Sequence, residues 1–78
     1  MTSDGPTRKR LAAVLRQARV ESGLTQEQLA DSAAVHRTYI SQLERGIKSP
    51  TVEVLQRISQ ALGQKTSTIL ARLEEAVE

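Results

Sequence analysis

Cysteine, phenylalanine and tryptophan are absent from this chain of 78 residues, and tyrosine and histidine occur once each. Without cysteine, disulfide bridges and thiolate metal sites are excluded. Because His36 is the single histidine, a multi-histidine zinc centre is excluded too, and we expect neither a metal nor a cofactor. One aromatic residue, Tyr39, argues against folds that bind single-stranded nucleic acid by stacking bases on aromatic side chains.

Long apolar runs are also missing. The longest uninterrupted run, Leu11 to Leu15, is far too short for a membrane span or a signal-peptide core. We therefore expect no membrane partner and a cytoplasmic location. The length fits one small domain, which buries so little surface that a partner subunit would add to its stability.

Apolar residues recur at helical spacing in five segments, and no segment alternates with the period of two that is typical of strands. We therefore predict an all-α fold of five short helices. Three of the four glycines follow the end of an apolar pattern, where a left-handed residue commonly terminates a helix. These glycines are Gly23, Gly46 and Gly63.

The first helical pattern begins at Arg8 and reaches Gly23. Residues 1–7 show no apolar period, so we expect them to form a flexible lead-in. The domain itself is expected to span residues 8–78.

Polar residues mark the starts of the later helices. Thr25 and Gln28 have the spacing of a capping box, and this second helix is expected to end near Ala33. His36 is expected to cap the third helix. Ser49–Pro50 resembles a cap followed by proline at the first position of the fourth helix. The fifth helix is expected to begin at Thr66 or at the residue after it.

The second and third helices are joined by only a few residues. So short a joint predicts a helix-turn-helix, in which the second helix of the pair enters the major groove of DNA. The third helix carries polar side chains on the side opposite Ile40 and Leu43. Arginine can bind guanine through two parallel hydrogen bonds, glutamine can bind adenine, and threonine offers a hydroxyl and a methyl group. The expected base-contacting residues are Arg37, Thr38, Ser41 and Gln42.

Longer motifs occur in a fixed order. Gly23–Ala30 (GLTQEQLA) is followed by Tyr39–Gly46 (YISQLERG) and by Ser49–Thr51 (SPT). This succession resembles the lambdoid phage repressor and Cro family, also called Xre-like regulators, over roughly residues 9–73. Within the family, His36–Ser41 is similar to the recognition helix of controller proteins from restriction–modification systems. The resemblance implies a compact, lambda-repressor-like five-helix domain.

The resemblance also implies roles for single residues. Arg19 and Glu44 match a partly buried ion pair that joins the first and third helices of the phage repressors. Ala34 stands at a turn position that is often glycine in the family, where a left-handed backbone costs alanine roughly 1 kcal/mol. Tyr39 has a second interpretation, in which its ring packs inside the domain. The residues that match phosphate-contacting positions are Gln26, Tyr39, Arg45, Lys48 and Thr51.

Apolar residues of the fifth helix spread over more of its surface than one core requires. We expect this helix to form a homodimer, because one recognition helix reads few base pairs and a two-fold partner supplies the second half-site. The alternative is a helix that only covers the core. The expected interface residues are Ile69, Leu70, Leu73 and Val77.

The charge is mildly basic, with 11 Lys and Arg against 9 Asp and Glu. Together these features predict a regulator of transcription that binds a two-fold symmetric operator on double-stranded DNA. RNA polymerase is a further partner if the operator lies just upstream of a promoter. An antitoxin or a protein-interaction module with the same fold is the alternative. An enzyme is not expected, since nothing orders the carboxylates and His36 into a nucleophile–base pair.

Overall fold

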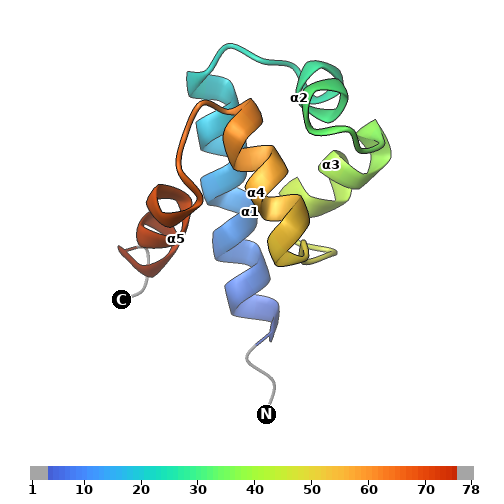
Figure 1. Cartoon of the computed structure of the whole chain (residues 1–78). Helices are drawn as coiled ribbons and strands as arrows, with labels where there is room; N and C mark the ends of the chain where they lie inside the picture. The colour runs from blue at the N-terminus through green and yellow to red at the C-terminus, as the bar shows by residue number, and fades with distance from the viewer. Residues whose placement is uncertain (1–3, 76–78) are drawn as a thin grey trace.

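Five α-helices follow one another along residues 4–75, the part of the chain that the computed structural model describes (Figure 1). No strand occurs in this range, so the prediction of a five-helix, all-α fold is confirmed. The helices are α1 (Asp4–Glu21), α2 (Gln26–Ala33), α3 (Arg37–Glu44), α4 (Val52–Ala61) and α5 (Thr66–Glu75).

The start of α1 differs from the expectation. The helix begins at Asp4 rather than at Arg8, so residues 4–7 form its first turn and not a flexible lead-in. Pro6 is compatible with this position. The N–H groups of a first helical turn have no partner within the helix, so proline, which lacks an N–H, costs no helical hydrogen bond there. Residues 1–3 of the expected lead-in lie outside the described range.

The start of α2 is the predicted capping box. The backbone N–H of Gln28 donates to Thr25 Oγ1 at 3.0 Å, and the backbone N–H of Thr25 donates to Gln28 Oε1 at 2.9 Å. These two bonds satisfy two of the N–H groups that a helix leaves unpaired at its first turn. The cap therefore fixes the point at which the chain enters α2.

The prediction for the start of α4 was wrong. The helix begins at Val52, and its cap is Thr51 instead of Ser49. Thr51 is extended, and its Oγ1 accepts from the backbone N–H of Val54 at 3.1 Å. Pro50 thus precedes the cap and lies outside the helix. Threonine and serine are both good caps, and the hydroxyl that meets the N–H three residues ahead is the one that defines the helix start.

The core lies where the helices converge. Helix α1 packs against α3 and α5, and α4 packs against α2 and α5. In Figure 1, α2 and α3 lie on one side of α1 and α4, and α5 lies on the other. Within residues 4–75, no helix combines the length and apolar character needed to cross a bilayer. The larger side chains that are nearly inaccessible to solvent are Leu15, Leu29, Ile40, Leu43, Ile58 and Ile69.

Ala34 has the left-handed backbone that the family resemblance implies. Its φ of 60° and ψ of 45° make it the one non-glycine residue with positive φ in the described part of the chain. The conformation lets the N–H of Val35 donate back to the carbonyl of Ala30 at 3.0 Å and close the end of α2. The strain is therefore located in the turn between α2 and α3.

We expect Ala34→Gly to raise the free energy of unfolding by about 0.5–1 kcal/mol. Glycine removes the left-handed strain, and its greater freedom in the unfolded chain offsets part of the gain. Urea unfolding followed by circular dichroism would measure the difference. Ala13→Gly, at an exposed position inside α1, is the control and should lower stability by about 1 kcal/mol. If both variants lost the same free energy of unfolding, the left-handed conformation of Ala34 would not be strained.

Candidate nucleic-acid interface

A tight turn joins α2 to α3. Only residues 34–36 separate Ala33 from Arg37, the last and first residues of the two helices. His36 is extended and stands at the cap position of α3, although its side chain makes no capping hydrogen bond. The pair of short helices with this turn is a helix-turn-helix motif.

Helix α3 has one buried and one accessible side. Ile40 and Leu43 are buried in the core, which fixes the rotation of the helix about its axis. With a helical repeat of 3.6 residues, the four predicted base-contacting residues fall on the side that remains accessible. Arg37 and Thr38 are exposed, and Ser41 and Gln42 are half-buried. The structure therefore brings these four residues together on one surface.

An open hollow of about 520 Å³ runs along this surface between the turn before α3 and the loop after it. Predicted base-contacting residues, Thr38 and Gln42, line it together with predicted phosphate-contacting residues, Tyr39 and Lys48. A second hollow, of about 380 Å³, brings Arg37 next to Gln26 at the start of α2. Both hollows border α3, so polar and cationic groups from three segments surround its accessible side.

The position of Tyr39 is compatible with both interpretations of its role, a phosphate contact and packing against the core. It is half-buried and packs against the core, and it also lines the larger hollow. Arg45 and Thr51 are exposed at the two ends of the loop between α3 and α4. The hydroxyl of Thr51 already accepts the capping bond of α4.

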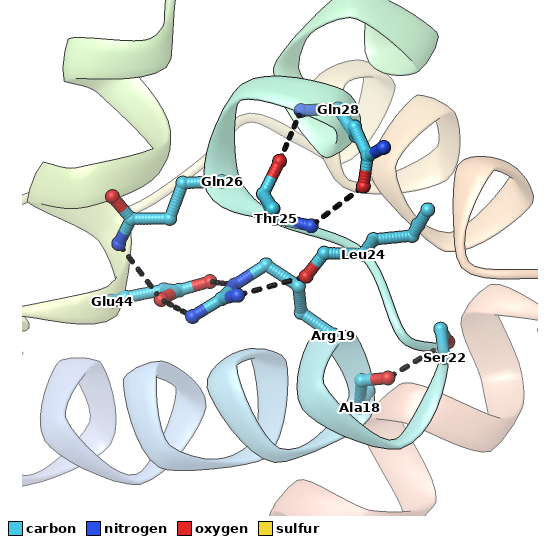
Figure 2. Close-up of polar contacts among 8 residues, drawn as sticks. All are labelled: Ala18, Arg19, Ser22, Leu24, Thr25, Gln26, Gln28 and Glu44. Atoms are coloured by element: carbon cyan, nitrogen blue, oxygen red, sulfur yellow. Dashed lines mark hydrogen bonds and ion pairs between the residues drawn. The ribbon is translucent and has the colours of Figure 1, made fainter.

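Arg19 and Glu44 form the predicted ion pair between α1 and α3 (Figure 2). Arg19 Nε donates to Glu44 Oε2 at 2.7 Å, and Nη2 donates to Oε1 at 3.1 Å. Arg19 Nη1 also donates to the carbonyl of Leu24 at 2.9 Å. The hydrogen bond with Glu44 raises the pKa of Arg19 above its ordinary value, against the opposing effect of burial. The pair therefore ties α3 to α1.

Gln26 joins this pair, a contact that the sequence analysis missed. Its Nε2 donates to Glu44 Oε1 at 3.1 Å (Figure 2). Glu44 thus orients both Arg19 and Gln26, and the side chain predicted to contact phosphate is held by the same carboxylate that fixes α3. No local pattern signals this bond, because it links residues from different helices.

Helix α5 divides the predicted dimer residues. Ile69 has no accessible surface and belongs to the domain's own core, so its assignment to a dimer interface was wrong. The cause is the packing of α5 on α1 and α4, which turns Ile69 inward. Leu70 is 42% exposed, and Leu73 is half-buried against the core. Val77 lies outside the described residues.

Comparison with known proteins assigns the chain to a family. A helix-turn-helix family model matches residues 15–70. Control protein C.BamHI of Bacillus amyloliquefaciens is 40% identical over 50 residues, which cover 64% of this chain and 62% of that protein. Transcriptional regulator ClgR of Mycobacterium tuberculosis is 44% identical over 57 residues, which cover 73% of this chain and 51% of the relative. The chain thus spans between half and two thirds of the length of these two proteins.

Solved structures agree with this assignment. The clp gene regulator ClgR from Corynebacterium glutamicum superposes with a TM-score of 0.85 at 34% identity, over 90% of this chain and 74% of that one. The wild-type restriction–modification controller protein C.Esp1396I gives a TM-score of 0.81 at 30% identity, over 88% and 91%. These relatives are regulators and control proteins rather than enzymes, and the resemblance found in the sequence is confirmed. The chain belongs to the Xre-like helix-turn-helix family of DNA-binding transcriptional regulators.

Proposed function

We propose that this chain binds a specific operator on double-stranded DNA by placing α3 in the major groove. The observation that carries the proposal is the accessible side of α3, where four polar side chains gather opposite the buried Ile40 and Leu43. A protein-interaction module with the same fold would not need four hydrogen-bonding side chains on this side of α3.

The four side chains differ in what they can read. Arg37 is exposed at the first turn of α3 and can bind guanine through two parallel hydrogen bonds. Gln42 has the donor and acceptor that adenine requires, and Thr38 can meet a base with its hydroxyl or its methyl group. Ser41 has the shortest reach and contacts a base only where the helix approaches closely. Together they would define a half-site of a few base pairs.

Groups around α3 would hold the DNA backbone. Tyr39 and Lys48 border the same hollow as Thr38 and Gln42, so a strand whose bases meet α3 would pass beside them. Gln26, Arg45 and Thr51 complete the set. Contacts to phosphate fix the position of the protein, whereas contacts to base edges provide the specificity. Each neutralised phosphate also releases a counterion, so affinity should fall steeply with salt.

A two-fold homodimer would supply the second half-site, about 34 Å from the first. The apolar side chain of Leu70 is exposed on α5, which supports this part of the proposal. Bound to an operator within a promoter, the protein would block RNA polymerase. Bound just upstream of the promoter, it would have RNA polymerase as a partner. The site of action would be the cytoplasm.

We expect Arg37→Ala to weaken binding to the operator by about 1–3 kcal/mol and to relax the preference at one base pair of each half-site. The loss follows from the two hydrogen bonds to guanine that alanine cannot make. Titration of the operator and of its single-base variants, followed by fluorescence anisotropy, would measure both effects.

Lys48→Ala is the matched variant, because it removes one exposed cation outside α3. It should weaken all sequences alike and reduce the dependence of affinity on salt. If Arg37→Ala also weakened operator and random DNA equally, the assignment of base contacts to α3 would be wrong.

Selection from a pool of random-sequence duplexes at two salt concentrations tests the function itself. Enrichment of a two-fold symmetric sequence, with strong salt dependence, is the expected result. Salt-dependent binding without enrichment would remove the sequence-specific part of the proposal. The chain is similar to control protein C.BamHI and to ClgR at comparable identity, and the enriched sequence would identify the genes under control.

A further inference from the structure

Near its start, α1 lies against the turn that follows α3. This contact is separate from the ion pair between Arg19 and Glu44, which joins the two helices nearer the end of α1. Gly46 in this turn has a φ of 74°. A Cβ atom at Gly46 would lie 3.4 Å from Cγ, 3.5 Å from Cα and 3.7 Å from the backbone N of Lys9. Figure 1 shows the N-terminal end of α1 beside the loop between α3 and α4. Lys9 therefore lies within van der Waals reach of this turn.

This approach creates a cluster of cations from two distant parts of the sequence. Lys9 is exposed next to Gly46, and Arg45 and Lys48 are exposed on either side of that glycine. None of the three forms an ion pair within residues 4–75. No acidic residue occurs in residues 5–20 or 45–52, so neither segment carries an acidic side chain that could neutralise the cluster.

We infer that Lys9 binds a phosphate of the DNA backbone, as an additional phosphate-contacting residue that α1 contributes to the interface. The inference rests on the proposed function, in which Arg45 and Lys48 already contact phosphates beside the base pairs that α3 reads. Lys9 lies next to Gly46 in that loop and does not line the hollow along α3, so its phosphate would flank those base pairs. A lysine ammonium is a compact point charge on a flexible stem, which suits it to a phosphate whose position varies.

The consequence is a longer footprint than α3 alone would give. Phosphate contacts carry no sequence information, so Lys9 would raise affinity for operator and random duplexes alike. It would also restrain the protein along the groove, because α1 and the loop after α3 would hold the strand at neighbouring points.

The test is the salt dependence of binding to a 40-base-pair duplex of mixed sequence, measured for the wild type and for Lys9→Gln, Lys48→Gln and Lys65→Gln. Each phosphate contact contributes about 0.9 to the slope of log affinity against log salt. We expect Lys9→Gln and Lys48→Gln each to flatten the slope by about this amount per protomer. Between 50 and 200 mM salt, one lost contact corresponds to about a 3.5-fold smaller fall in affinity.

Lys65→Gln is the control, because it makes the same change of charge at an exposed lysine between α4 and α5. Its slope should equal that of the wild type, and Lys9→Arg should keep the wild-type slope as well. Ethylation interference should show one flanking phosphate whose modification weakens the wild type but not Lys9→Gln.

Two outcomes separate this inference from the proposed function. If Lys48→Gln flattened the slope and Lys9→Gln matched Lys65→Gln, the role of Lys9 would be overturned and DNA binding would stand. If the wild type bound no duplex at either salt, the proposed function would be overturned and this inference with it.

Discussion

Arg19→Met is expected to lower the free energy of unfolding by about 3–5 kcal/mol, because it leaves the buried Glu44 carboxylate without its cationic partner. The side chain of Glu44 is 4% exposed and that of Arg19 is 13% exposed, so little water can replace the lost contact. The substitution also removes the donor to the carbonyl of Leu24. Equilibrium unfolding in urea would measure the loss, provided that the free energy of unfolding falls with urea concentration at the same slope as in the wild type.

The double variant Arg19→Met with Glu44→Leu separates the charge from the packing. Replacing both partners removes the stranded carboxylate, so this variant should be more stable than Arg19→Met alone. Arg19 and Glu44 are in direct contact, so the effects of the two substitutions on stability should be far from additive. A double variant whose loss equalled the sum of the two single losses would contradict a coupled pair.

The extent to which this fold follows from its sequence depends on how local the deciding interaction is. The capping box of Thr25 and Gln28 was predicted correctly, because both of its hydrogen bonds lie within one helical turn. The accessible side of α3 was also predictable. Once Ile40 and Leu43 are buried, the helical repeat decides which residues face away from the core.

The errors occur where two local solutions compete. Ser49 and Thr51 are both suitable caps, and the choice between them depends on where α4 must begin in order to pack on α2 and α5. Similarly, Pro6 is compatible with an irregular segment and with a first helical turn, so its presence could not define the start of α1.

Contacts between distant residues of the site were even less accessible to local reasoning. Arg19 and Glu44 are 25 positions apart, and their pairing was expected only from the family resemblance. The bond from Gln26 to Glu44 and the approach of Lys9 to Gly46 were not expected at all. Each depends on how helices are placed in space, which a pattern along one helix does not encode.

The second large effect is expected in α5. Ile69→Ala should lower the free energy of unfolding by about 2–5 kcal/mol, since the side chain is fully buried and its truncation leaves a cavity between α5, α1 and α4. The cost belongs to the single domain, so the melting temperature should fall by the same amount at low and at high protein concentration. Thermal unfolding at two concentrations would measure this.

Leu70→Ala is the matched substitution, because it shortens the neighbouring side chain, which is 42% exposed. If Leu70 contacts a second copy of the chain, the wild-type melting temperature rises with concentration, and Leu70→Ala removes part of that rise while leaving the dilute protein nearly as stable. Sedimentation should show the variant dissociating at concentrations where the wild type is dimeric. A wild type that remained monomeric, with and without DNA, would rule out the dimer, whereas the loss expected for Ile69→Ala would persist because it arises within one domain.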